Sequence, residues 1–531
     1  MLRRPLLFSA LLALCLPAWA ADPATQWWAD VSALAHDDMK GRLTGTADYL
    51  RAADYVISRL KAEGIKPAGT KGYLQPVSLE QQVVDQAASR ADLVAANGAV
   101  VPLKVGDDIL FSAGGGPRPA QVDAPLVFIG YGLHLPKQGH DDFAGQDLKG
   151  KIVVVLSGGP ADISGAIKSN ARFERSEALS KMGAVGVISL TTPKQVEILW
   201  ERQKLLVRQP GMYLADAALR DIKGPFFGAT VDPAQAERLL QGSGHSFASL
   251  AALADASKPL PRFAMPLRFK ASIAATRSRL SSPNIVAVLE GSDPKLKSQY
   301  ITLSAHLDHL GVGAAIKGDT IYNGAMDNAT GVASVLDIAR RLKSGPAPKR
   351  SVLFLFFTAE EKGLLGSSYF ARRPTAPKAS IVANMNLDMA LPLWPLKSVF
   401  SPGQEESSLG EDMRAVASTM GIAVTTDPMP DRNSFTRADQ YSFVREGIPA
   451  LFFKFGFERD TPEAKIERDW RANQYHSPSD DLDQPILKNE AVKLNALAAG
   501  IIRRVADAQG KPQWVPGSIF AKDLPAPGKA K

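Results

Sequence analysis

The spacing of hydrophobic and polar positions changes along the chain, and these changes predict its elements. From Leu50 to Leu60 the apolar residues recur at helical spacing, which predicts an early helix. Beyond residue 75, short apolar runs broken by Gly and Pro predict strands. From residue 282 onward, apolar runs alternate with helical stretches. That alternation is typical of a doubly wound sheet.

The fold class predicted from this pattern is α/β, with a doubly wound, mostly parallel sheet and helices on both faces. A short helical fragment could hardly fold alone, so we expect residues 21–95 and 281–510 to form one discontinuous domain. Residues 96–280 would then be a β-rich α+β insertion, and residues 511–531 a C-terminal tail.

The first twenty residues have the pattern of a secretory leader. Arg3 and Arg4 precede an apolar run, and Ala18-Trp-Ala offers a small-x-small cleavage signal. We expect residues 1–20 to be a signal peptide cut after Ala20, and the protein to be exported to the periplasm or the medium. A membrane anchor is the alternative, but the run is shorter than the roughly 20 apolar residues of a span, and no other such run follows.

The cysteine count limits the possible metal ligands, and the charge distribution bears on nucleic-acid binding. The single cysteine, Cys15, lies within the leader, and lipid attachment there is disfavoured by Leu14, where a lipoprotein signal usually has Gly or Ala. A metal site in the mature chain must therefore use nitrogen and oxygen donors. The formal charge falls from +8 to +6 without Arg3 and Arg4, with no dense Lys/Arg run, so no nucleic-acid partner is indicated.

Imidazoles and carboxylates gather where predicted strands end. Ligands of open α/β sheets bind at the carboxyl ends of the strands, so we expect these side chains to meet. Their chemistry, two histidines with several carboxylates, indicates a metal hydrolase. The candidates are His306, Asp308, Asp327, Glu360, Glu361, Asp388 and His476.

Three of these carboxylates have distinct expected tasks. Asp327 lies in a short loop before a helix, where it suits a carboxylate that bridges two metals, although alone it would be read as a helix cap. Glu360 and Glu361 are adjacent, so they should point in different directions. One can bind metal while the other takes a proton from water and passes it to the leaving amine.

Residues next to the candidate ligands have other expected roles. Asp308 is two residues from His306 and can orient that imidazole. His309 is expected to be structural, because nothing pairs it with a second ligand segment. Met389 and Tyr475 adjoin candidate ligands, and either a side-chain pocket or ordinary packing explains them.

Five separated segments resemble, in order, the M28 family of zinc aminopeptidases. They are His-x-Asp, Asp-Asn-Ala-x-Gly, Glu-Glu-x-Gly-Leu-x-Gly-Ser, Asn-Leu-Asp-Met and Tyr-His-x-x-x-Asp, and the resemblance extends over residues 44–65 and most of 282–504. It implies two Zn²⁺ ions and a zinc-peptidase sheet. By this resemblance His306 and Asp388 hold one ion, Glu361 and His476 hold the other, Asp327 bridges them, Glu360 is the general base and Asp308 orients His306.

Two further segments bear on the resemblance. Arg437-Ala-Asp looks like the family's later Arg-Ser-Asp segment, and Ala438 departs from it without touching a metal ligand. Gly130-Tyr-Gly and the segments 147–155 and 182–188 resemble the protease-associated (PA) domain inserted in several peptidase families. We place this PA-like domain at about residues 120–260.

The resemblance implies a dizinc aminopeptidase that removes N-terminal residues from peptides, and the leader pattern adds the expectation of export. A carboxypeptidase of the same architecture is the first alternative, and it would need a cationic cluster for a terminal carboxylate, for which Arg432 or Arg437 could be taken. A one-zinc glutaminyl cyclase is disfavoured because the ligands for both metals are present. A non-catalytic receptor or binding protein is disfavoured because all five ligands and the base are present.

Overall fold

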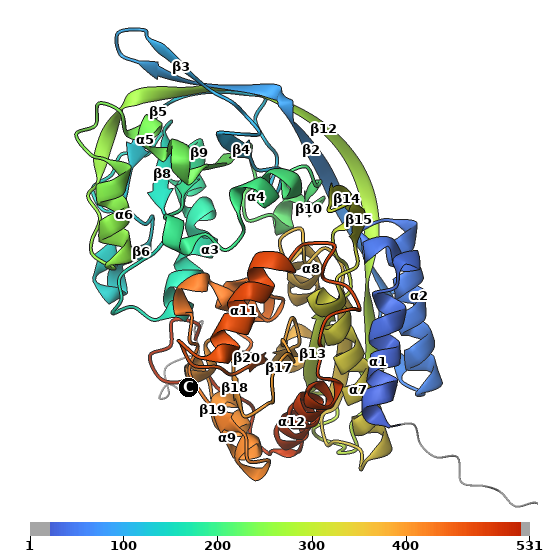
Figure 1. The fold of residues 1–531 in the computed structure, drawn as a ribbon. Coiled ribbons are helices and arrows are strands. Elements are labelled where there is room, and N and C mark those ends of the chain that lie inside the picture. The colour runs from blue at the N-terminus through green and yellow to red at the C-terminus, as the bar shows by residue number, and fades with distance from the viewer. Residues whose placement is uncertain (1–21, 522–531) are drawn as a thin grey trace, which may run out of the picture.

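The computed structural model describes residues 22–521, which form two parts joined by a long ribbon (Figure 1). The ribbon pairs β2 (Leu74–Ala95) with β12 (Phe263–Leu289) in antiparallel register. We call residues 23–79 and 280–521 the core part, and residues 80–279 the inserted part. The predicted signal peptide and Cys15 lie outside the described residues.

The core part contains a mostly parallel sheet. The end of β12 pairs antiparallel with β16 (Ser351–Phe357). Next come β13 (Tyr300–His306), β17 (Ile381–Asn386) and β20 (Ala450–Phe452), each parallel to its neighbour. The predicted mixed and mostly parallel sheet is confirmed, and the parallel strands bring their carboxyl ends to one edge.

Helices cover both faces of this sheet, as predicted. Along β16, Val352, Phe354 and Phe356 belong to one apolar cluster, and Leu353, Leu355 and Phe357 to another, because successive side chains of a strand point to opposite faces. The first cluster includes residues of α1 (Pro23–Leu34), α2 (Ala47–Ala62), α7 (Thr330–Ser344), α9 (Leu409–Thr419) and α12 (Lys488–Asp507). The second includes residues of α8 (Leu365–Arg372) and α10 (Gln440–Val444).

The N-terminal helices share their core with the late sheet. Trp27 and Tyr49 are fully buried in the same cluster as Ile301. Arg42, which follows α1, is also buried, and its guanidinium donates to the carbonyl oxygens of Leu34, Leu307, Asn323 and Gly324. The N-terminal segment thereby holds the loops that follow β13 and precede α7.

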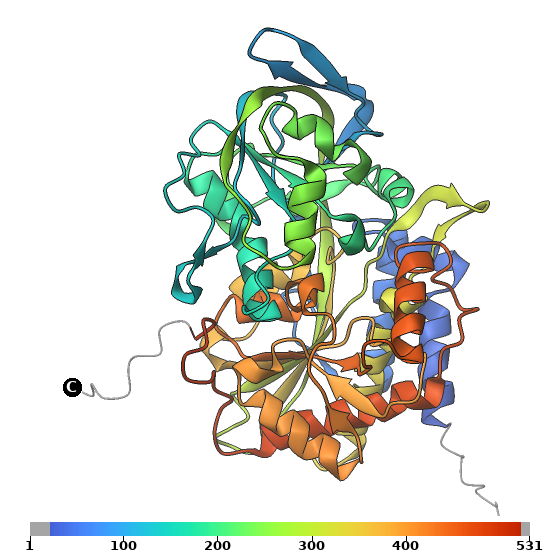
Figure 2. The ribbon, with the colours of Figure 1, turned by 60° about the vertical axis from the view of Figure 1, so that its left-hand side comes forward.

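The inserted part continues the same sheet, because β12 pairs with β16 of the core part and with β5 of the inserted part (Figure 2). It has an apolar cluster of its own. Its parallel strands are β5 (Gln121–Phe128), β8 (Ile152–Leu156), β9 (Gly186–Leu190) and β11 (Phe227–Val231). Its helices include α3 (Gly165–Lys181), α4 (Trp200–Leu206) and α6 (Phe247–Asp255). The members of this cluster lie between Val84 and Ile273. It therefore begins within residues 21–95, which the sequence analysis assigned to the discontinuous peptidase domain.

The C-terminal segment is packed further than expected. Residues 511–521, placed by the sequence in a tail, include Trp514 and Phe520, whose rings lie against each other and near Phe435. The Trp514 indole donates to the carbonyl oxygen of Gly447 at 2.9 Å. Within residues 22–521, no helix is long and apolar enough to cross a membrane.

Candidate active site

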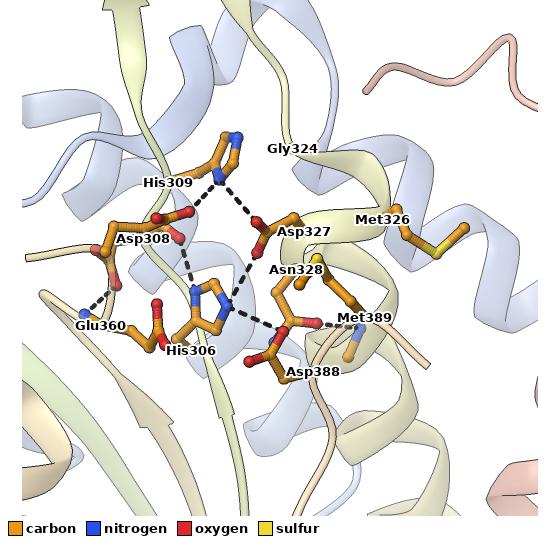
Figure 3. A network of polar contacts seen from close by, with 12 residues as sticks. His306, Asp308, His309, Gly324, Met326, Asp327, Asn328, Glu360, Asp388 and Met389 are labelled. Atoms are coloured by element: carbon orange, nitrogen blue, oxygen red, sulfur yellow. Dashed lines mark hydrogen bonds and ion pairs between the residues drawn. The ribbon is translucent and has the colours of Figure 1, made fainter. Parts of the chain in front are cut away.

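The predicted site residues meet at the carboxyl edge of the core sheet. Figure 3 shows five of them: His306, Asp308, Asp327, Glu360 and Asp388. His306 ends β13, Glu360 and Glu361 follow β16, and Asp388 follows β17. Since β16, β13 and β17 are parallel neighbours, their ends place these groups side by side. His476 arrives from the loop after α11 (Pro462–Asn473).

His306, Asp327 and Asp388 form what we call the first half-site. The His306 Nε2 lies 3.2 Å from an Asp327 carboxylate oxygen and 3.6 Å from one of Asp388. One donor atom from each residue lies within 4.8 Å of the others, and all three residues are buried. The His306 Nδ1 contacts the backbone carbonyl oxygen of Asp308 at 3.0 Å, which places a proton on Nδ1 and leaves Nε2 free to bind a metal.

Asp327 also belongs to a second half-site, with Glu361, His309 and His476. The His476 Nε2 lies 3.2 Å from Asp327 Oδ2 and 3.1 Å from Glu361 Oε2. The other Glu361 oxygen lies 2.7 Å from His309 Nδ1, which is 4.0 Å from Asp327 Oδ2. The expectation that nothing pairs with His309 is therefore wrong: its partner lies 52 positions further along the chain.

The donor atoms of both half-sites suit a metal. In the first half-site, His306 Nε2 and Asp388 Oδ1 are buried and make no hydrogen bond with any residue from 22 to 521. Buried polar atoms of native proteins are nearly always paired, so these atoms call for a further partner. Nitrogen and carboxylate donors in this ratio fit zinc and similar divalent ions.

The charges of the site support the same conclusion. Burial disfavours a charged imidazole, yet Glu360, Asp327 and Asp388 hold the pKa of His306 well above its ordinary value. For Asp327, His306 and His476 outweigh burial and hold the pKa well below its ordinary value. Protons on the imidazoles thus balance the carboxylates, and a cation can take their place because metal binding releases protons from its ligands.

Glu360 lies beside both half-sites without joining either cluster. Burial raises the pKa of Glu360 well above its ordinary value, and Asp388 and Asp439 add to the effect. Burial also raises the pKa of Asp439 to about 7. A carboxylate with a raised pKa is suited to exchange protons near neutral pH.

The structure changes the role expected of Asp308. Its backbone carbonyl contacts His306, whereas its carboxylate accepts hydrogen bonds from the Thr44 hydroxyl at 2.9 Å and the Glu360 backbone N–H at 3.0 Å. Asp308 therefore fixes the imidazole through its main chain and the proposed base through its side chain. Thr44 was missed because it lies far from this loop in sequence.

Asp327 is not the cap of α7, which begins at Thr330. It lies in the preceding turn, Ala325–Ala329, and the Asp480 carboxylate accepts hydrogen bonds from the backbone N–H groups of Met326 and Asp327 at 2.8 and 2.9 Å. Asp480 ends the Tyr-His-x-x-x-Asp segment. The spacing of that segment therefore lets one loop supply His476 and hold the loop of Asp327.

Left-handed backbone conformations lie beside the site. Met389 has φ 44° and His476 has φ 53°, and both have Cβ atoms that disfavour this region. Such conformations persist where the surrounding structure enforces them, commonly at functional sites.

Residues 284–502, which contain every predicted metal ligand, match the profile of peptidase family M28. Residues 284–502 therefore form a peptidase family M28 domain.

Its M28 relatives include several proteins described as aminopeptidases. It is 28% identical over 250 residues to aminopeptidase YwaD of Bacillus subtilis, covering 46% of this chain and 49% of that protein. It is 26% identical to leupeptin-inactivating enzyme 1 of Streptomyces exfoliatus, covering 39% of this chain and 45% of that protein. The chain thus spans about half the length of these curated relatives.

Among solved structures, the aminopeptidase from Aneurinibacillus sp. strain AM-1 resembles this chain over most of its length. The TM-score is 0.52 at 20% identity, with 92% of this chain and 95% of that chain covered. At this identity the likeness concerns the fold. It includes the inserted part as well as the core part.

The M28 half-sites face a cavity of about 1170 Å³ between the two parts, which we call the outer cavity. Met389 and Tyr475 line it, so both lie where a substrate pocket was considered. Arg437 donates to Glu197 at 2.8 Å and to the Tyr475 hydroxyl at 3.1 Å. Glu197 belongs to the inserted part, which therefore forms one wall of the M28 site.

The two arginines considered for a substrate carboxylate already have acidic partners. The Arg432 guanidinium donates to both Glu467 carboxylate oxygens at 2.6 Å, and Arg437 is paired with Glu197. Arg202, from α4, donates to the backbone carbonyls of Ala472 and Tyr475. The inserted part thereby holds the segment that carries His476.

Proposed function

We propose that this chain is an exported metallo-aminopeptidase that holds two zinc ions and removes N-terminal residues from peptides. The observation that supports it most is the pair of half-sites that share Asp327, with Glu360 beside them. Two sites that share one carboxylate are the pattern of two-metal hydrolases. The relatives described as aminopeptidases favour this reaction within the family.

Each residue has a defined task in the proposed reaction. When bound, divalent ions at the half-sites would lower the pKa of water and polarise the scissile carbonyl. Glu360 would take a proton from the attacking water and deliver it to the leaving amine. The Asp308 carboxylate accepts a hydrogen bond from the Glu360 backbone N–H. This bond helps to position the Glu360 carboxylate before substrate arrives.

The carboxypeptidase alternative receives no support from Arg432 and Arg437. Each already pairs with a carboxylate of the protein, so a substrate carboxylate would have to compete with that ion pair. The complete donor set also opposes a non-catalytic receptor.

A panel of peptides tests the reaction. Peptides with a free amino group, with a blocked amino end and with a blocked carboxyl end are incubated with the full chain, with and without chelator. We expect hydrolysis of every peptide with a free amino group, none of N-blocked peptides, and loss of hydrolysis with chelator. Cleavage of N-blocked peptides from their C-terminus would instead identify a carboxypeptidase.

Export and the number of ions are tested separately. The leader pattern of residues 1–20 supports export, and the mass of protein recovered outside the cytoplasm should correspond to cleavage after Ala20. Metal analysis should find close to two ions per chain. A fully active protein with one ion would favour a one-zinc site.

A further inference from the structure

A second cavity, of about 440 Å³, lies between the inserted and core parts. We call it the inner cavity. Its lining includes Lys362, which directly follows the candidate ligand Glu361, and Arg175 from α3. It shares Phe173, Arg175, Gly363 and Leu364 with the outer cavity, so the two cavities adjoin.

Lys362 lacks a hydrogen-bond or ion-pair partner among the described residues. It is 8% exposed and makes no hydrogen bond or ion pair with any residue of the described chain. The carboxylates that act on it electrostatically are Glu361 and Asp308. Glu361 contacts two histidines, and Asp308 accepts hydrogen bonds from Thr44 and Glu360. An ammonium group that lines a cavity without an ionic partner can form a charge-assisted hydrogen bond with an anionic ligand there.

Arg175 is a second, independent observation. Its Nε is buried and makes no hydrogen bond within residues 22–521. The one hydrogen bond of its guanidinium to a described residue runs from Nη1 to the Tyr131 carbonyl oxygen at 3.2 Å. Burial, with the nearby charge of Arg172, lowers the pKa of Arg175 to about 10, so it remains a cation at neutral pH. Two cations from different parts of the chain therefore border one cavity.

The acidic groups of the inner cavity do not neutralise these cations. Asp221 pairs with Arg372 and Arg445, and Glu177 lies 3.5 Å from Arg445. The remaining wall includes apolar side chains from both parts, among them Leu214, Ile222, Phe226 and Leu365. Its volume falls within the roughly 300–1,000 Å³ of small-molecule sites.

We propose that the inner cavity binds a carboxylate carried on an apolar body, with the carboxylate at Lys362 and Arg175 and the body against the apolar wall. This chemistry belongs both to the C-terminus of a short peptide and to a separate small organic acid. The shared border at Gly363 and Leu364 would let a peptide in the outer cavity reach the inner one. The proposal does not depend on which peptide bond the enzyme cleaves.

Binding of N-acetylleucine to the full chain with its metals tests the proposal, with N-acetylleucinamide as the matched neutral ligand. Calorimetry should show the acid bound at least about tenfold more tightly than the amide, because a charge-assisted hydrogen bond replaces a neutral one. Lys362→Met should weaken binding of the acid about tenfold and leave the amide unchanged. Arg175→Met should also weaken binding of the acid.

Lys137→Met, an exposed lysine of the inserted part, is the matched control and should bind the acid like the wild type. Thermal unfolding shows whether each variant is folded. If Lys362→Met is not folded, Arg175→Met still tests the site. Equal binding of acid and amide would overturn the proposal. So would unchanged acid binding in both folded variants, because the acid would then be held elsewhere, for instance at the metals.

Hydrolysis kinetics distinguish a substrate's own C-terminus from a separate acid as the source of the carboxylate. If it is the substrate's own C-terminus, Lys362→Met should lower kcat/KM for Leu-Gly-Gly more than for Leu-Gly-Gly amide. If the site serves a separate acid, the two peptides should respond equally while N-acetylleucine binding is still lost. A chain that binds the acid but hydrolyses neither peptide would refute the aminopeptidase proposal alone.

Discussion

The two half-sites share Asp327 but are built differently. The first takes His306 and Asp388 from the ends of neighbouring strands, and the His306 side chain is 1% exposed. The second takes His476 from a loop in a left-handed conformation, and that side chain is 17% exposed. Strand ends hold their side chains more rigidly than loops do. We infer that the first half-site is better organised, and that the second depends on its supports.

The largest expected effect concerns the group that serves both half-sites. Glu360→Gln removes the proposed base but no metal ligand, so we expect both ions to remain while kcat falls about 10²–10⁴-fold. Steady-state kinetics and metal analysis of the same preparation measure the two quantities. Activity within a few-fold of wild type would remove Glu360 from the mechanism, and loss of one ion would show that it is itself a ligand.

The next effect separates the histidines of the second half-site. His476→Ala should lose one ion. His309→Ala should retain it at saturating metal but bind it about 10–100-fold more weakly, because a residue that orients a ligand tunes affinity. The reason is the 2.7 Å contact from His309 to Glu361, a predicted ligand.

Metal titration monitored by calorimetry measures this difference. The exposed His134 of the inserted part gives the control, His134→Ala, which should bind both ions like the wild type. If His309→Ala loses the ion and His476→Ala retains it, the ligand roles of the two residues are reversed. Weakening of the first half-site by His309→Ala would contradict the division into two halves.

The contrast between the half-sites also marks how far the sequence could predict this site. His306, Asp327, Glu360 and Asp388 follow predicted strands or precede a predicted helix, and a parallel sheet gathers such positions at one edge. The mostly parallel sheet was predictable from the same alternation. These residues depend on local pattern, which one sequence displays.

Other features depend on contacts between distant segments. His309 could not be paired with Glu361 because no local pattern relates them, although its position three residues after His306 was a signal. For Asp308 the residue was predictable, but which of its groups contacts the imidazole depends on backbone geometry. No local pattern marks Arg42 or Arg202, yet both donate to carbonyls of segments that carry site residues.

A smaller effect concerns α11, the helix that leads to His476. Burial opposes the charge of Glu467, but Arg471 and Arg432 outweigh it and hold its pKa below the ordinary 4.5. A lowered pKa contributes stability that is fully present above 4.5 and is lost as pH falls through the folded-state value. Glu467→Gln should lower the free energy of unfolding by about 2 kcal/mol at neutral pH, and by less as the pH falls below 4.5.

Denaturant unfolding of the chelated proteins between neutral and acidic pH measures this difference. Glu458→Gln changes an exposed acid just before the same helix and should have no pH-dependent effect. A Glu467→Gln deficit that stays constant into acid would mean that packing, rather than the ion pairs, accounts for it.

The smallest effect tests whether the inserted part supports the second half-site alone. Arg202→Met removes the donors to the Ala472 and Tyr475 carbonyls, next to His476, and touches nothing in the first half-site. A net hydrogen-bond contribution of about 1 kcal/mol corresponds to roughly fivefold weaker binding of one ion. Arg208→Met, an exposed arginine just after α4, should leave both affinities unchanged. Equal weakening of both ions would mean that Arg202 acts on the whole interface, and the second half-site would then owe its looser structure to its own loop.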